Sequence, residues 1–312
     1  MIPVSPRAAR ARVAAATLPA LLAVAWPLLA PGAAGGQAPP DSARRAAAAA
    51  APSSPDTVPR LTESLLRPFR WRLIGPANPA GRVTAIAVAE TKGRKTMYVG
   101  FASGGVWKTT NNGVTWQPVF DDQGFASIGD VAVAPSDPNV VWVGTGEAFI
   151  RSHISIGNGI YKSTDGGRTW RHMGLDATGR IARIVIHPTN PDIVYAAAVG
   201  HAYGPQPERG VYRTLDGGRT WERVLFVDEN TGASDIVMDP TNPRILFAGM
   251  WQIVIRTWGR ESGGPGSGIY KSTDGGTTWR RLEGNGLPTR PVGKIGLAVA
   301  QRDPNRVYAL IE

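Results

Sequence analysis

The chain has 312 residues, a formal net charge of +10 and no cysteine. The lack of cysteine excludes a disulfide framework and a lipid-modified cysteine. The basic residues are spread along the chain and do not cluster with aromatic residues, so the composition argues against binding of nucleic acid.

Residues 1–38 have the features of a Sec-type signal peptide, with arginines ahead of the apolar stretch 13–30 and small residues after it. They predict a secreted or periplasmic bacterial protein that meets the membrane only through an uncleaved signal. A membrane anchor is the alternative, but Pro19 and Pro27 interrupt a stretch that is short for a spanning helix. Residues 39–60, rich in alanine and proline, are interpreted as a disordered linker.

From residue 61 onward a repeat organises the sequence. The segment Ser-Thr-Asp-Gly-Gly-Arg-Thr-Trp at 163–170 recurs in similar form at 214–221 and 272–279, and in a divergent form at 109–116. A fixed period of roughly fifty residues, with one supersecondary unit per period, is typical of a repeat architecture.

Each period is predicted to hold four short strands. Turns of the type Pro-x-(Asn/Asp)-Pro at 135–138, 188–191 and 240–243 separate two runs of β-branched and aromatic residues. The recurring Gly-containing segment then joins two further strands in a hairpin. Four-stranded antiparallel units that repeat radially are β-propeller blades, so we predict an all-β fold.

Residues 61–312 are interpreted as an incomplete propeller of about four and a half blades. The expected blades lie near 81–120, 127–174, 179–225 and 233–282, and a fifth begins at 293. The remainder of the propeller is expected in the same chain or in another one.

The recurring turn is expected to be structural. Its Asp or Asn can accept backbone hydrogen bonds, its glycine supplies a positive φ, and its tryptophan offers a large face for packing between blades. The residues given this structural role are Asn111, Trp116, Asp165, Gly167, Trp170, Asp216, Gly218, Trp221, Asp274, Gly276 and Trp279.

The pattern Ser-x-Asp-x-Gly-x-Thr-Trp resembles the Asp-box of bacterial neuraminidase repeats (BNR), found in sialidases, two-propeller xyloglucanases and sortilin-type receptors. Together with the proline turns, residues 70–312 are most similar to large secreted bacterial proteins with a sortilin-like N-terminal propeller. The resemblance implies the fold. It transfers no catalytic residue, because no sialidase-type arginine motif is recognisable, and xyloglucanase catalysis uses aspartates on two separate propellers.

The loops between the second and third strands of the blades vary in sequence and share one face, which we expect to bind a ligand. The residues proposed for this face are Arg151, His153, His201, Tyr203, Trp251, Arg256 and Trp258. Their aromatic rings suit sugars and peptide side chains alike, or else merely cover the rim of the propeller. We expect no metal and no cofactor.

Glycoside hydrolysis needs two carboxyl groups on either side of the scissile bond. Glu147, Asp121, Asp122 and Asp228 lie in loops expected on the same face and are candidates; solvated loop charge is the alternative. Three functions therefore remain open. The first is a module that binds a peptide, protein or glycan, the second a glycoside hydrolase on extracellular polysaccharide, and the third a scaffold or assembly factor of an envelope complex.

Overall fold

The computed structural model describes residues 62, 81–150, 154–289 and 291–312. The chain divides into two compact units, residues 1–72 and 73–312, and every described strand belongs to the second. The signal peptide and linker expected from the sequence lie outside the described residues. In the part of the chain that is described, no helix is long and apolar enough to cross a membrane.

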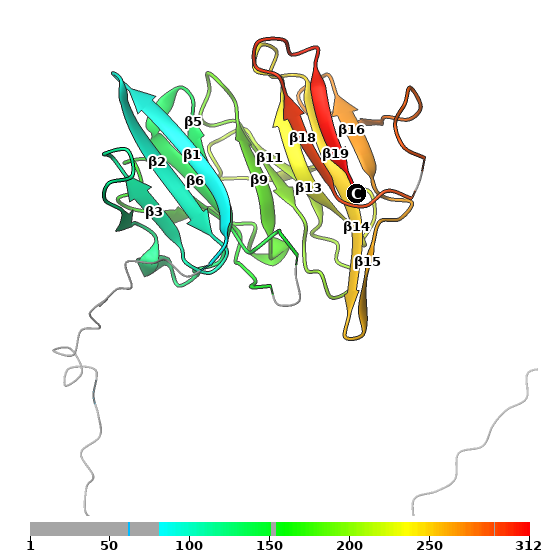
Figure 1. Ribbon diagram of the computed structural model, residues 1–312, viewed down its shortest axis with the longest axis horizontal. Coiled ribbons are helices and arrows are strands. Elements are labelled where there is room, and N and C mark those ends of the chain that lie inside the picture. Colours follow the sequence, from blue (N-terminus) through cyan, green and yellow to red (C-terminus); the bar gives the residue numbers. More distant parts are fainter. Residues whose placement is uncertain (1–61, 63–80, 151–153, 290) are drawn as a thin grey trace, which may run out of the picture. The chain divides into compact units, whose positions relative to one another are not determined.

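The second unit is a series of antiparallel sheets that follow one another in sequence order, which confirms the predicted all-β propeller architecture (Figure 1). We name these sheets blades 1 to 5. Blade 1 comprises β1 (Val83–Thr91), β2 (Arg94–Phe101), β3 (Val106–Thr109) and β4 (Gln117–Pro118). Blade 2 comprises β5 (Ile128–Ala134), β6 (Asp137–Thr145), β7 (Ile160–Ser163) and β8 (Arg171–His172).

The later blades continue the pattern, with an extra strand in blade 4 and two described strands in blade 5. Blade 3 comprises β9 (Ile181–Ile186), β10 (Val194–Ala198), β11 (Gly210–Thr214) and β12 (Glu222–Leu225). Blade 4 comprises β13 (Thr231–Met238), β14 (Leu246–Arg256), β16 (Gly268–Ser272) and β17 (Arg280–Arg281), with β15 (Gly259–Ser262) paired to β14. Blade 5 consists of β18 (Ile295–Val299) and β19 (Val307–Ile311). Short 3-10 turns, η2 (Asp121–Gln123) and η3 (Asp176–Thr178), lie between blades.

The sheet of blade 4 differs from the sequence expectation. The segment after Met250 was expected to be a loop, but β14 runs on to Arg256 and pairs with β15 as a hairpin. Figure 1 shows this hairpin projecting beyond the ends of the neighbouring sheets. The extension follows from the mostly apolar, β-branched stretch 250–256, which favours a strand and satisfies its backbone by pairing with β15. One of the segments predicted to form the ligand face is therefore a regular hairpin and not a loop.

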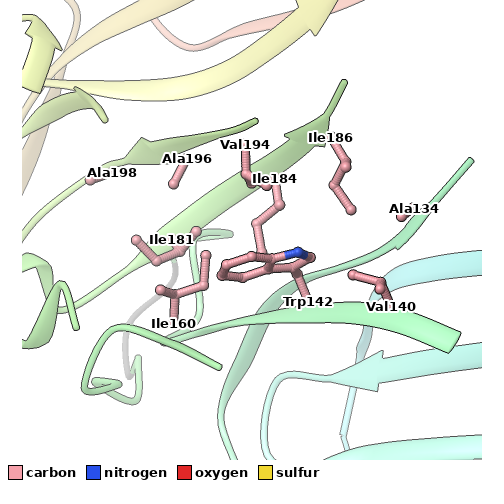
Figure 2. Packing of buried hydrophobic residues seen from close by; sticks show 10 residues of the cluster. All are labelled: Ala134, Val140, Trp142, Ile160, Ile181, Ile184, Ile186, Val194, Ala196 and Ala198. Atoms are coloured by element: carbon pink, nitrogen blue, oxygen red, sulfur yellow. The ribbon is translucent and has the colours of Figure 1, made fainter. Parts of the chain in front are cut away.

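The core lies between successive blades, because the second strand of each of blades 1 to 4 is buried on both faces over most of its length. Val141, Trp142 and Val143 of β6 are all fully buried. Figure 2 shows Trp142 of blade 2 at the centre of one interblade cluster, beside Ile181 and Ile184 of blade 3. A side chain of this size anchors a packed interface by its apolar area.

Small residues on the second strands set how closely the blades approach. A Cβ placed on Gly144 would lie 2.5 Å from Cγ2 of Ile181 in the next blade. A Cβ on Gly100 would likewise lie 2.7 Å from Cγ2 of Ile128. Each isoleucine therefore occupies the space that a larger residue on the preceding blade would need, and the two sheets pack at a close, fixed distance.

The Asp-box turn is held by one carboxylate and one hydroxyl. The Asp165 Oδ1 atom accepts hydrogen bonds from the N–H groups of Thr169 (2.9 Å) and Arg168 (3.0 Å), and Oδ2 accepts from the Thr169 hydroxyl (2.6 Å). The Ser163 hydroxyl oxygen accepts from the Gly167 N–H group (2.8 Å). The bond from the Thr169 hydroxyl, followed by the backbone bonds, lowers the pKa of Asp165 because these donors favour the carboxylate.

Each Asp-box is also tied to the blade before it. In blade 2, the carbonyl oxygen of Gly166 accepts hydrogen bonds from Tyr98 Oη (2.9 Å) and Lys108 Nζ (2.7 Å) of blade 1. The Lys108 ammonium lies 5.5 Å from the centre of the Tyr98 ring. The indole N–H of Trp170 donates to the Val119 carbonyl oxygen (2.6 Å). We name the cation, the aromatic residue and the glycine carbonyl together the blade latch.

The blade latch recurs at the next two interfaces. Between blades 2 and 3, Lys162 Nζ donates to the Gly217 carbonyl oxygen over 3.2 Å. Between blades 3 and 4, Arg213 Nη1 and Tyr195 Oη both donate to the Gly275 carbonyl oxygen, each over 2.7 Å. Three interfaces thus use one arrangement, in which a cation on the third strand holds the Asp-box of the following blade.

Candidate functional site

A groove with a volume of about 1310 Å³ opens where segments of blades 2 to 5 meet. The loop after β6 contributes Phe149 and Ile150, and the loop after β10 contributes Tyr203. The β14–β15 hairpin contributes Trp251, Ile255, Arg256, Thr257, Gly259 and Arg260, and the two strands of blade 5 contribute Lys294, Gly296, Leu310, Ile311 and Glu312. The groove therefore lies on the face formed by the variable loops, where the sequence analysis expected a ligand.

Lys294 lies between two aromatic rings of the groove. Its ammonium is 4.4 Å from the centre of the Phe149 ring and 5.4 Å from that of Trp251, within the range of cation–π attraction. Burial lowers the pKa of Lys294, although the negative charges of Asp235 and Glu312 act in the opposite direction. The groove thus contains a largely desolvated cation that aromatic faces hold in place.

Trp251 forms part of the wall beneath this cation. It is only 2% exposed, and its indole N–H donates to Ser262 Oγ over 3.0 Å. The Ser262 hydroxyl in turn donates to Glu312 Oε2 over 2.6 Å, and the same carboxylate oxygen accepts the Lys294 backbone N–H (3.0 Å). These bonds connect the hairpin of blade 4 to blade 5 and fix the orientation of the Trp251 ring.

The accessible aromatic surface of the groove comes from the loops. Phe149 is 47% exposed and Tyr203 is 60% exposed. Two arginines line the hairpin side of the groove, where Arg256 pairs with Glu261 (3.3 Å) and Arg260 Nη1 reaches the Ile150 carbonyl oxygen (3.4 Å). A ligand that enters the groove therefore meets two open aromatic faces and a row of hydrogen-bond donors.

A fully buried arginine holds the loop that carries Tyr203. Arg209 Nη2 donates to the carbonyl oxygens of His201 (2.5 Å) and Gly204 (3.0 Å), and Nη1 donates to that of Asn230 (2.6 Å). Burial lowers the pKa of Arg209 to about 10. Because its donors satisfy loop carbonyls away from water, Arg209 positions the loop and does not line the groove.

An ion-pair cluster that joins the half-exposed Arg183 to two buried carboxylates connects the inner strands of three blades. Arg183 Nε lies 2.9 Å from Asp235 Oδ1, and Arg183 Nη1 lies 3.9 Å from Asp130 Oδ1. The second oxygens accept backbone N–H groups of the following blades: Asp130 Oδ2 from Ile184 (2.6 Å) and Asp235 Oδ2 from Leu297 (2.8 Å). Burial raises the pKa of Asp130 to about 6, because Arg183 lies nearer to Asp235 and compensates the desolvation only in part.

The structure brings together three of the residues proposed for the ligand face, Tyr203, Trp251 and Arg256. Trp258 lies beside the groove at the end of the β14–β15 hairpin and is 82% exposed. His201 is half-buried behind the groove, where burial, followed by the charge of Arg180, lowers its pKa. Arg151 and His153 lie outside the described residues. The ligand-binding role of all of them stays a prediction.

The candidate carboxylates have different surroundings. Asp121 and Asp122 are exposed in η2 and line a separate hollow beside the Asp-box of blade 2. Glu147 is 3% exposed and forms an ion pair with Arg82. Asp228 Oδ1 accepts the Asn230 N–H group (2.8 Å) within its own loop. Their catalytic role stays a prediction, and among the described residues no group of three His, Cys, Asp or Glu could hold a metal ion.

Lys294 and Arg260 line the groove without having been singled out in the sequence. No break in the apolar pattern marks Lys294, because it precedes β18, and the first residue of that strand, Ile295, packs on the preceding blade as Ile181 does. No signal marks Arg260 either, because its place depends on the hairpin that the sequence did not predict.

Comparison with known proteins agrees with this architecture. Residues 158–289 match the Sortilin-Vps10 family, described as "Sortilin, neurotensin receptor 3". A xyloglucanase from a Paenibacillus species is 26% identical over 255 residues, covering 73% of this chain and 23% of the relative. A vacuolar protein sorting/targeting protein 10 from Sordaria macrospora is 28% identical over 118 residues, covering 37% of this chain and 7% of the relative.

Solved structures give the same relationship. The crystal structure of an ancestral GH74 enzyme superposes with a TM-score of 0.55 at 26% identity and covers 76% of this chain and 28% of that protein. The GH74 enzyme of Niastella koreensis, at 21% identity and a TM-score of 0.53, shares the fold over 72% of this chain and 33% of that protein. The chain spans about a quarter of the length of the curated xyloglucanases that it matches. It is an Asp-box β-propeller related to the Sortilin-Vps10 family and to GH74 xyloglucanases.

Proposed function

We propose that this Asp-box propeller is the ligand-binding part of an extracellular protein and that its groove holds an extended glycan chain. The observation that carries the proposal is the groove itself, which the exposed rings of Phe149 and Tyr203 line. The xyloglucanases among the relatives support a glycan over a peptide or protein ligand. The extracellular location rests on the signal-like residues 1–38.

The chemistry of the groove suits a sugar polymer. Open aromatic faces bury the apolar face of a pyranose ring, and the neighbouring arginines can donate to its hydroxyl groups. Phe149 is also held under Lys294, so little side-chain freedom is lost when a ligand covers the ring. Removing one of the two exposed rings should cost about 1–2 kcal/mol of binding energy, which is roughly a 5- to 30-fold rise in Kd.

The test is isothermal titration of the full chain with xyloglucan oligosaccharides and, in parallel, with unsubstituted β-glucan oligosaccharides. Phe149→Ala and Tyr203→Ala should weaken binding by that factor. Trp258→Ala is the matched control, because Trp258 is 82% exposed beside the groove and does not line it. Equal losses in all three variants, or saturable binding of peptides with no binding of any glycan, would overturn the proposal.

A glycoside hydrolase is the second candidate, since the relatives named as xyloglucanases favour it. Hydrolysis would need two carboxyl groups about 5 to 10 Å apart across the bond to be cleaved. Release of reducing sugar from xyloglucan by the full chain decides between the two functions. Release that Glu147→Gln or Asp122→Asn abolishes, with the fold intact by circular dichroism, would replace the binding proposal; binding without release supports it.

A further inference from the structure

The dipeptide Asn-Gly occurs three times in the chain, at Asn112–Gly113, Asn158–Gly159 and Asn285–Gly286. An asparagine that precedes glycine is especially prone to deamidation, because glycine has no Cβ to hinder attack by its backbone nitrogen on the asparagine side chain. The dipeptide gives the three sites the same chemistry. Their surroundings in the fold therefore decide which of them reacts.

At Asn112 the attacking nitrogen is held. The Gly113 N–H group donates to the Thr109 hydroxyl oxygen over 3.0 Å, within the Asp-box turn of blade 1. A Cβ placed on Gly113 would meet Trp116 at 3.7 Å and Met97 at 4.0 Å, so the glycine is also packed against neighbouring side chains. Reaction at this site requires the hydrogen bond to break first.

At Asn158 the side chain itself is held. Its Nδ2 atom donates to Tyr161 Oη over 2.9 Å, and the backbone N–H group of the same residue donates to Thr145 Oγ1 over 2.8 Å. Gly159 is buried, and a Cβ placed on it would overlap the Gly174 carbonyl oxygen. Neither the approach of the glycine nitrogen nor the entry of water is open at this site.

Asn285 has none of these restraints. Asn285 and Gly286 are both exposed, and both have a positive φ, at 50° and 86°. These angles are typical of a type I′ turn, which one hydrogen bond from the Leu287 N–H group to the Gly284 carbonyl oxygen closes (3.0 Å). A Cβ placed on Gly286 would meet no atom within 4 Å. Among the described residues, the Gly286 N–H group and the Asn285 side chain have no hydrogen-bond partner.

The place of this turn in the blade repeat accounts for its exposure. It lies in the connection from β17 to β18, between blades 4 and 5. The corresponding connection from β8 to β9 also has exposed residues, Asp176 and Ala177, although blade 3 follows it with all four strands. A connection of this kind thus remains open to water beside a four-stranded blade.

We propose that Asn285 is a site of spontaneous deamidation in the folded protein. The Gly286 nitrogen attacks Cγ of Asn285, and the bond from Cγ to Nδ2 breaks as ammonia leaves with the proton of the attacking N–H group. A five-membered succinimide results. Water then opens the ring, which gives aspartate when the bond from nitrogen to Cγ is cleaved and isoaspartate when the bond from nitrogen to the main-chain carbonyl carbon is cleaved.

The modification changes both the charge and the backbone of this connection. Either product places a carboxylate at position 285, close in sequence to Glu283. Isoaspartate also adds one methylene group to the main chain of the turn. No residue that lines the groove is altered, so the modification is independent of glycan binding there.

The test incubates the full chain at mildly alkaline pH below its unfolding temperature. Peptide mapping by mass spectrometry follows each site and separates aspartate from isoaspartate peptides. Conversion at Asn285 should proceed at least about tenfold faster than at Asn112 or Asn158, a ratio that corresponds to about 1.4 kcal/mol, the scale of one or two hydrogen bonds. The same chain unfolded in urea is the control, and there the three sites should react at similar rates.

Asn285→Gln is the matched variant, because its longer side chain would have to form a six-membered ring. It should remove the modification at 285 without changing the rates at the other two sites. Equal rates at the three sites of the folded chain, or faster conversion at Asn112 or Asn158, would overturn the proposal. So would a folded chain that is still unmodified at 285 long after the unfolded chain has been converted. A ratio that persists in urea would show that neighbouring sequence and not the fold sets the rates, and would overturn it as well.

Discussion

The tryptophan of the Asp-box should be a major source of interblade stability, and Trp170→Ala measures it. The Trp170 ring packs edge-on against Phe120 of the preceding blade, with ring centres 5.2 Å apart and planes at 79°, and its indole N–H donates to the Val119 carbonyl. Truncation of a buried tryptophan costs about 3–5 kcal/mol. Trp170 is only partly buried, so we expect a loss of about 3 kcal/mol.

Trp116 provides the matched control, because it has the same place in the Asp-box of blade 1 but is 37% exposed. Trp116→Ala should cost less than about 1 kcal/mol. Trp170→Phe separates the two contributions of the residue, since it keeps a ring against Phe120 and removes the indole donor. That variant should lose about 1–2 kcal/mol.

The assay is urea unfolding of the full chain followed by circular dichroism, with stability read from the transition midpoint at constant slope. Equal losses of stability for Trp170→Ala and Trp116→Ala would refute the reasoning. The free energy lost would then depend on the position of the tryptophan in the motif and not on its contact with a preceding blade. A loss below about 1 kcal/mol for Trp170→Ala would equally exclude a packed interblade role.

Three further predictions concern charged groups. The raised pKa of Asp130 means that the folded state binds the carboxyl proton more tightly than the unfolded state does, so the free energy of unfolding falls as pH rises from about 4 to about 6. Asp130→Asn should flatten the pH dependence of the urea midpoint in that window. The lowered pKa of Asp165 has the opposite effect on stability: the carboxylate stabilises the fold above about pH 4, and this contribution is lost as pH falls further. Asp165→Asn should therefore reduce the loss of stability in acid. It should keep the turn, as judged by near-UV circular dichroism, because Asn111 makes the corresponding hydrogen bonds in the Asp-box of blade 1. Arg209→Met should destabilise by about 3 kcal/mol or more and speed proteolysis within 199–209, whereas unchanged cleavage would show that the arginine does not hold this loop.

The blades were predictable because the information is local and repeated. Proline turns and Asp-boxes act within a few residues, and each occurs several times, so a single departure such as Asn111 does not obscure the pattern. The sequence analysis placed Tyr203 and Trp251 on one face, because the position of a connection follows from the order of the strands, and both residues line the groove. The structure adds that Trp251 is buried and that Tyr203 is open.

The groove itself was not predictable at the level of contacts. Its central cation, Lys294, comes from blade 5 and lies against Phe149 of blade 2, which is far away in the sequence. Such a pairing depends on how the sheets are arranged in space, and no local pattern encodes it. The same holds for Arg183, whose side chain meets Asp130 and Asp235 of the two neighbouring blades only after the inner strands have been brought side by side.

The blade latch implies that the blades are completed in the order in which they are synthesised. The Gly166 carbonyl of blade 2 accepts hydrogen bonds from Tyr98 and Lys108, which precede it in the chain, and blades 2 and 3 are likewise held by the Asp-box hairpin of the next blade. As the polypeptide emerges from its N-terminal end at about 5–20 residues per second, one blade of roughly fifty residues should be locked every few seconds. Each newly synthesised sheet therefore exposes its apolar side only until one more repeat has been synthesised. This shortens the time during which the exposed side can cause aggregation.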